Sequence, residues 1–196
     1  MQTKSKEETD RSSGKNKPIR VDHYQRGWFA KGASVGFSTT YLAVRKNPRT
    51  YFNGTIFRLA SADAIKKYDK REKYYCRVAV PSAYIHILNY QPLPKGEFWI
   101  YEIKPEFIAK ASERYPMVES YVDIFLAGCL EIQEKFHLKD FAAECIDCTT
   151  DWSTHWVNDR IYPRRPFVFE PNASKIDQLL VDKIPEIFNH IRLESH

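Results

Sequence analysis

The sequence of 196 residues has no uninterrupted apolar run near the length of about 20 residues that a membrane-spanning helix needs. Its N-terminus has no apolar core either, so it does not read as a secretory signal peptide. The four cysteines, Cys76, Cys129, Cys145 and Cys148, lack the spacing of a disulfide framework. These absences argue against a membrane-spanning helical protein and a disulfide-rich secreted domain. They predict a cytoplasmic protein with reduced thiols and no membrane partner.

A strong charge of one sign is also lacking. The net charge is +5, but six Lys or Arg residues lie before Val21, against three acidic residues in the same stretch. The rest of the chain is only mildly basic, and its aromatic residues fall at strand and core spacings, so we do not expect nucleic acid as a partner. Hydrophobic residues make up 43% and aromatic residues 14% of the chain, which is enough for one packed domain.

The order of predicted elements indicates an α+β fold. Residues 1–18 are polar and are expected to form a flexible tail, followed by one domain over residues 19–196. Strands are predicted where β-branched and aromatic residues cluster, at residues 19–30, 39–45, 51–59, 74–81 and 97–103. Helical periodicity predicts helices at residues 61–68, 116–136, 141–148 and 176–188, the last interrupted at Pro185. Strands therefore come first, and the C-terminal half is expected to be mainly helical.

Glu72 is the leading candidate for chemistry. It lies in the turn after the helix that we expect to begin at Ser61, between Arg71 and Lys73. A carboxylate that is partly withdrawn from water has a raised pKa and suits proton transfer near neutral pH. The alternative is an exposed acid in a salt bridge, which is the commoner situation for a carboxylate flanked by cations.

Three motifs follow one another around Glu72. In order, they are Gly54-x-Ile56-Phe57, then Asp69-x-Arg71-Glu72 after a helix, and Tyr75-x-Arg77-x-x-Val80. Together they resemble the centre of the γ-glutamylcyclotransferase-like family. A second block is similar to the C-terminal half of that family's longer members: Pro116–Asp123, with Ser120 and Tyr121, Asn158-Asp159-Arg160, and Pro163-Arg164-Arg165-Pro166.

The resemblance implies a small mixed β-barrel with packed helices, and a reaction that cyclises a γ-glutamyl group to 5-oxoproline with release of an amine or peptide. It implies Glu72 as the general acid/base, a small γ-glutamyl substrate, and no cofactor or metal. The substrate-binding residues would be Tyr75, Arg77, Ser120 and Tyr121, although Ser120 could instead cap a helix. The alternative function is a catalytically inactive relative that binds a ligand or protein through residues 152–165.

Members of that family open with a Tyr-Gly-Ser-Leu-type loop whose backbone amides hold the substrate, and no such loop occurs in this sequence. Residues 5–9 resemble the part that follows the loop. We therefore expect the sequence to begin just downstream of it, as a truncated or a naturally shortened form.

Two further pairs of residues have alternative interpretations. His155 and Asp159 would share a face if their segment were helical, but no nucleophile motif accompanies them, and a structural hydrogen bond is the preferred interpretation. Cys145 and Cys148 form a Cys-x-x-Cys pair near the end of a predicted helix, whereas redox pairs of this kind lie at a helix start. Zinc would need two more ligands. We interpret both cysteines as small buried hydrophobic residues.

Overall fold

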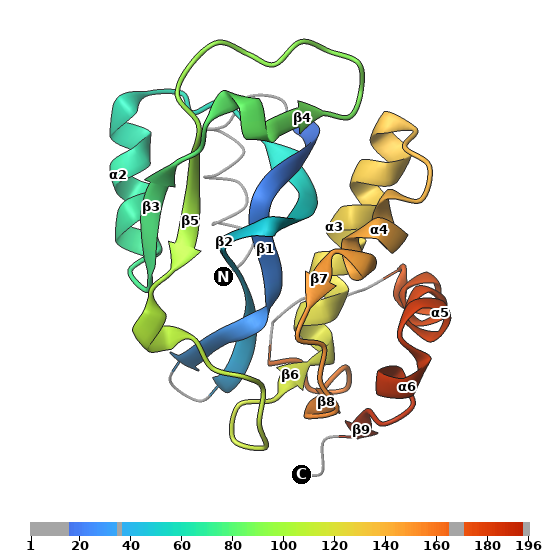
Figure 1. Ribbon diagram of the computed structural model, residues 1–196. Coiled ribbons are helices and arrows are strands. Elements are labelled where there is room, and N and C mark those ends of the chain that lie inside the picture. Colours follow the sequence, from blue (N-terminus) through green and yellow to red (C-terminus); the bar gives the residue numbers. More distant parts are fainter. Residues whose placement is uncertain (1–15, 35–36, 165–170, 194–196) are drawn as a thin grey trace.

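The computed structural model describes residues 16–34, 37–164 and 171–193 and has a mixed α/β architecture (Figure 1). Its centre is an antiparallel pair of long strands, β1 (Lys17–Ser34) and β2 (Phe37–Ile56). The strands predicted at residues 39–45 and 51–59 are one strand, β2, with a bulge at Asn47-Pro48 in place of the break expected between them. Lys46 pairs with Tyr24, while Tyr51 already pairs with Asp22. The predicted tail, residues 1–18, lies mostly outside the described residues, and β1 already begins at Lys17.

The described strands form three open sheets, which corrects the expected closed barrel. In the first sheet, β1 pairs with β2 and also with β4 (Ile85–Ile87) and β7 (Thr149–Thr150). The second sheet is the antiparallel pair β3 (Tyr75–Ala79) and β5 (Trp99–Ile103), which among the described strands pair with each other alone. The third consists of β6 (Met117–Val118), β8 (Trp156–Asn158) and β9 (Arg192–Leu193). The described strands do not close into a ring because no hydrogen-bonded ladder joins one sheet to another.

Helices cover both sides of the central strand pair (Figure 1). On one side lie β3, β5 and helix α2 (Ala62–Arg71), whose N-cap Ser61 accepts a hydrogen bond from the backbone of Ala64 as predicted. The other side carries the longer helices α3 (Glu119–Phe136), α4 (Phe141–Asp147), α5 (Ala173–Lys183) and α6 (Pro185–Phe188). Short 3-10 turns occupy Ser82–Tyr84 (η1) and Pro105–Phe107 (η2).

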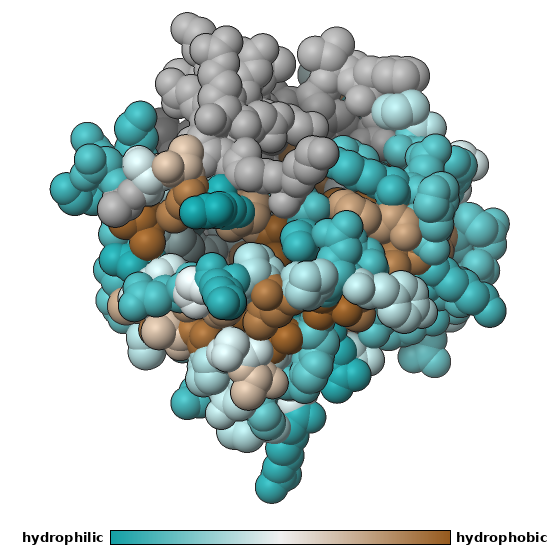
Figure 2. All heavy atoms as spheres, turned by 90° about the horizontal axis from the view of Figure 1, so that it is seen from above, coloured by the Kyte–Doolittle hydropathy of each residue, from teal (hydrophilic) through white to brown (hydrophobic). Residues whose placement is uncertain are grey.

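Strand β1 contributes to each of three hydrophobic clusters. Trp28 packs with apolar residues of α3, α4 and α5 in the largest cluster. Ile19, Val21 and Tyr24 belong to the second cluster, and Phe29 belongs to the third with Ala43 and Ile103. Seen from above, apolar side chains reach the surface in strips that polar side chains interrupt (Figure 2). Within the described residues, no helix is both long and apolar enough to cross a bilayer.

Candidate active site

Glu72 ends helix α2 and begins the turn into β3. Its backbone N–H donates to the carbonyl of Tyr68 at 2.8 Å, which closes the last turn of the helix. Its own carbonyl accepts from the backbone N–H of Tyr75 at 2.9 Å, which fixes the first residue of β3. Both bonds hold the Glu72 backbone, so the position of its side chain is defined by the junction of helix and strand.

The carboxylate of Glu72 is partly exposed and already has a cationic neighbour. Arg71 Nε donates to Glu72 Oε1 at 2.7 Å, and the Glu72 side chain is 25% exposed against 51% for Arg71. The Arg71 guanidinium also lies 4.8 Å from the centroid of the Tyr68 ring. The salt bridge that the sequence offered as an alternative is therefore present. The carboxylate is nonetheless within reach of solvent.

A polar cluster lies next to Glu72, one turn earlier in α2. Asp69 accepts hydrogen bonds from Arg77 Nε at 2.9 Å and from the Tyr101 hydroxyl at 2.7 Å. Burial raises the pKa of Tyr101 most, and the Asp69 bond and the charge of Glu72 raise it further. The hydrogen bonds from Tyr101 and Arg77 lower the pKa of Asp69. The Arg77 guanidinium stacks 4.5 Å from the Trp99 ring, so its described contacts hold β3 and β5 to α2.

Tyr101 was not among the residues predicted from the sequence. It lies directly opposite Arg77 in the antiparallel register of β3 and β5, which sequence spacing alone does not define. A correct strand pairing would have identified Tyr101 as the cross-strand neighbour of a predicted site residue.

Tyr75 and Tyr121 approach the same part of β2 from different elements. The Tyr75 hydroxyl donates to the carbonyl of Leu42 at 3.5 Å, a long hydrogen bond. The Tyr121 ring stands edge-on to Tyr41, with the ring centroids 5.5 Å apart, and also edge-on to Trp28 at 5.6 Å. Both tyrosines are only partly buried. The structure therefore brings these two predicted residues toward adjacent positions of one strand.

Ser120 lies in the first turn of α3 and binds Asp159. The carboxylate of Asp159 accepts the Ser120 backbone N–H and the Ser120 hydroxyl, both at 2.7 Å. Asp159 is thus the cap of this helix, where an acceptor satisfies a free N–H and a negative charge is favourable. The Ser120 side chain is fully buried. The helix-capping role that the sequence suggested for Ser120 is performed by Asp159.

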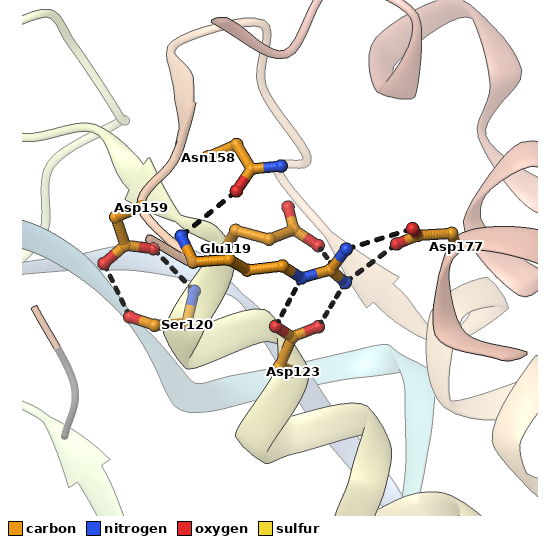
Figure 3. A network of polar contacts seen from close by, with 7 residues as sticks. Glu119, Ser120, Asp123, Asn158, Asp159 and Asp177 are labelled. Carbon is orange, nitrogen blue, oxygen red and sulfur yellow. Dashed lines mark hydrogen bonds and ion pairs between the residues drawn. The ribbon is translucent and has the colours of Figure 1, made fainter. Parts of the chain in front are cut away.

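Arg160 is the centre of a buried ionic network (Figure 3). Its guanidinium forms a two-pronged pair with Asp123, at 2.8 and 2.6 Å, and another with Asp177, at 3.0 and 2.8 Å. Its Nη2 also donates to Glu119 at 3.1 Å. The Asn-Asp-Arg motif therefore joins α3, β8 and α5 and lies away from the Glu72 cluster.

Three carboxylates around one guanidinium cannot all be ionised at low cost. Glu119 is 1% exposed, and burial raises its pKa to about 8 although Arg160 opposes that shift. Burial also raises the pKa of Asp123, with Arg160 acting in the opposite direction. With a pKa of about 8, Glu119 is expected to keep its proton at neutral pH.

The proposed His155–Asp159 pair is not formed, because its premise of a helix is wrong. Residues 156–158 form strand β8, and residues four apart in a strand lie about 13 Å apart, too far for a side-chain hydrogen bond. Asp159 binds Ser120, and His155 is exposed. In the same segment the Trp152 and Trp156 rings stack at 5.6 Å within the largest core cluster. Arg165 lies outside the described residues.

Comparisons with known proteins give only distant likenesses. No protein-family model matches the sequence, and neither does any curated protein. A solved structure named gamma-glutamyl cyclotransferase is 12% identical, with 68% of this chain and 80% of that chain covered and a TM-score of 0.47. The solution structure of an Arabidopsis thaliana protein is 15% identical, with 63% and 73% covered and a TM-score of 0.36. At these values the likeness carries no argument about activity.

Proposed function

We propose that this chain is a γ-glutamylcyclotransferase-like protein that cyclises a γ-glutamyl group to 5-oxoproline with release of an amine or peptide. The observation that carries the proposal is the carboxylate of Glu72. It stands partly exposed at the α2–β3 junction, in the motif order that resembles the family, and beside the Asp69–Arg77–Tyr101 cluster.

The reaction is an intramolecular aminolysis. The α-amine of the substrate attacks its own γ-carbonyl carbon, a new C–N bond closes the five-membered ring, and the original amide C–N bond breaks. Because both reactants belong to one molecule, holding the correct rotamer supplies much of the rate. Glu72 would take the proton from the attacking amine and deliver it to the leaving nitrogen, so no cofactor is consumed.

The neighbouring residues would then have distinct roles. Tyr75 would line the substrate site on the Glu72 side of the central strand pair, whereas Tyr121, on α3 at the other side of that pair, would reach the site only beside Tyr41 of β2. Arg77 is bound to Asp69 and stacked on Trp99, so we assign it a positioning role, with any contact to the substrate's carboxylate made by the remaining N–H groups. Ser120 would act through Asp159 by fixing the start of α3, which carries Tyr121.

The second candidate is a non-catalytic binding module that uses residues 152–165. Trp156 in this segment is buried, but Ile161 and Tyr162 are 77% and 65% exposed. Exposed large apolar residues on a loop favour contact with a partner. This interpretation predicts binding that depends on these two residues and not on Glu72.

The test is release of 5-oxoproline from glutathione, a γ-glutamyl amino acid and a γ-glutamyl amine. Glu72→Gln should lower kcat by roughly 10²–10⁴-fold, the usual contribution of a positioned acid/base. The matched control is Glu113→Gln, an exposed carboxylate whose loss should leave the rate unchanged. Equal activity in the wild type and Glu72→Gln, or no release from any substrate, would contradict the proposal and favour the binding module.

A further inference from the structure

Arg26 is a buried cation whose direct partners in the described chain include no carboxylate. It is 8% exposed and lies in the middle of β1. Its Nε donates to Thr149 Oγ1 at 2.8 Å, and Nη1 donates to the carbonyl of Asn53 at 2.6 Å. Nη2 donates to the carbonyl of Cys145 at 2.8 Å and to the side-chain oxygen of Asn53 at 3.2 Å. All these acceptors are neutral, and an isolated buried charge is costly.

One further acceptor of Arg26 can acquire a full negative charge. The Sγ atom of Cys148 lies 3.2 Å from Arg26 Nη2. The same sulfur is 3.4 Å from Asn53 Oδ1 and 3.9 Å from the carbonyl of Cys145. A thiol that loses its proton here becomes the direct counter-ion of the guanidinium. Nearby cations stabilise thiolates in this way.

The other titratable groups around this cluster act at one remove or are thiols. Glu144 contacts Asn53 Nδ2 at 3.4 Å, so its carboxylate reaches Arg26 only through the amide. Burial raises the pKa of Tyr51, and Glu144 raises it further. Cys129, from α3, is hydrogen-bonded to Cys145 and completes a group of three thiols.

The thiols respond to these surroundings in different directions. Burial acts to raise the pKa of Cys145, but the hydrogen bond from Cys129 and the charge of Arg26 outweigh it, and the pKa of Cys145 is lowered. Burial raises the pKa of Cys129 and of Cys148, and Arg26 opposes both shifts. The charge of Arg26 acts to lower the pKa of all three thiols, in the direction that the 3.2 Å contact with Cys148 requires.

Cys145 and Cys148 are also spaced for a disulfide. The backbone N–H of Cys148 donates to the carbonyl of Glu144 at 2.9 Å, so the helical bonding pattern of α4 continues through Cys148. Residues three apart in a helix have Cα atoms roughly 5 Å apart, which lies inside the range that disulfides accept. Cys148 is partly exposed while Cys145 is fully buried, so a small oxidant can meet the pair at Cys148.

We propose that Cys145 and Cys148 form a redox-active dithiol, which Arg26 activates and a hydroperoxide oxidises. The Cys148 thiolate attacks the terminal peroxide oxygen and the O–O bond breaks. The product alcohol or water leaves with a proton from solvent. The resulting sulfenic acid on Cys148 is attacked by the sulfur of Cys145, an S–S bond forms, and water leaves. The protein loses two hydrogen atoms, that is two protons and two electrons, and the peroxide is reduced.

The first experiment uses the intact chain and hydrogen peroxide. Free thiols are blocked with a light alkylating reagent, the protein is reduced, and the released thiols are labelled with a heavy reagent. We expect a mass loss of two hydrogen atoms and heavy label on Cys145 and Cys148 together. Heavy label on Cys129 or on exposed Cys76, or no mass loss, would overturn the proposal.

The second experiment tests the role of Arg26 in a Cys76→Ser background, which removes the exposed thiol. Arg26→Met should slow disulfide formation about tenfold, because the thiolate loses its cation, and Arg26→Lys should restore much of the rate. Arg114→Met, which removes a cation at an exposed position, is the matched control and should react as fast as its parent. Equal rates for Arg26→Met and its parent would overturn the activating role. If Arg26→Met does not fold, the rate of disulfide formation is measured in the parent protein over a range of pH. The rate should fall as pH decreases, with the heavy label still on Cys145 and Cys148. A rate that does not change with pH would overturn the thiolate step.

Discussion

Two arginines of this molecule, Arg160 and Arg26, each bind several elements but have opposite surroundings. Arg160 is surrounded by Glu119, Asp123 and Asp177, so its charge is over-compensated and one acid keeps its proton. Arg26 has neutral oxygens and a sulfur around it, so its charge is under-compensated. The difference lies in which neighbour titrates: a carboxyl group beside Arg160 and a thiol beside Arg26.

The comparison separates structural from reactive ion chemistry. A guanidinium bound by two bidentate carboxylates has a structural role, and its removal leaves the carboxylates close together without a counter-ion. A guanidinium with only neutral partners favours any nearby group that can become an anion. In this chain that group is a thiol, which makes the Arg26 side the chemically responsive one.

The largest expected effect is that of Arg160→Met. Removing the cation leaves Asp123 and Asp177 close together, one of them fully buried, and should cost about 3–5 kcal/mol of unfolding free energy. Urea denaturation followed by fluorescence measures it. Arg49→Met, at an exposed position, is the control and should change stability by less than about 0.5 kcal/mol. A loss of stability in Arg160→Met as small as that of the control would mean that the ionic network does not stabilise the fold. The contrast between Arg160 and Arg26 would then fail.

The next effect is a pH dependence that Glu119 imposes. Its folded-state pKa of about 8 lies above its ordinary value of 4.5, so between these values the unfolded chain has lost the proton that the folded protein keeps. The stabilisation is therefore complete below the lower value and is lost as pH rises through the higher one, by roughly 1.4 kcal/mol per pH unit between them.

Glu119→Gln keeps the shape of the protonated acid and should flatten this slope. Unfolding free energies at about pH 5.5 and about pH 7.5 should differ by roughly 2–3 kcal/mol less in the variant than in the wild type. Some slope should persist, because burial raises the pKa of Asp123 as well. Identical slopes in the two proteins would show that Glu119 is ionised at neutral pH.

The smallest of the three effects is expected for Arg26→Met. Its neutral acceptors lose their donors, which should cost about 1–3 kcal/mol, and no pair of buried acids is left uncompensated. Urea denaturation under reducing conditions gives the value beside that of Arg160→Met. Equal costs for the two substitutions would mean that both arginines carry the same structural weight, and the contrast would fail.

Local patterns in the sequence predicted much of the fold. Ser61 predicted the start of α2, and helical periodicity predicted α3, because both signals act between residues a few positions apart. The Asn47-Pro48 pair predicts a break between two strands, because an Asn-Pro pair is typical of a turn. The same pair is compatible with a bulge inside one strand, and only the pairing of Lys46 with Tyr24 distinguishes the bulge from the turn. The expected barrel depends on which strands pair, and local patterns do not contain that information.

The candidate site shows the same division. The motif around Glu72 placed that residue correctly at the end of a helix, but its link to Tyr101 runs across strands. The sequence favours small hydrophobic roles for Cys145 and Cys148 because the pair falls near the end of a predicted helix rather than at its start. The cation that changes this interpretation, Arg26, lies more than a hundred positions away and reaches them through the pairing of β1 with β7.

The path of β1 through all three hydrophobic clusters makes unfolding cooperative. Trp28 belongs to one cluster, Val21 to the second and Phe29 to the third, and all three side chains move with a single backbone. A cluster cannot loosen without displacing the strand that the other two share, so partial melting of one side removes support from the other. The described part of the chain therefore behaves as one thermodynamic unit in spite of its three separate sheets.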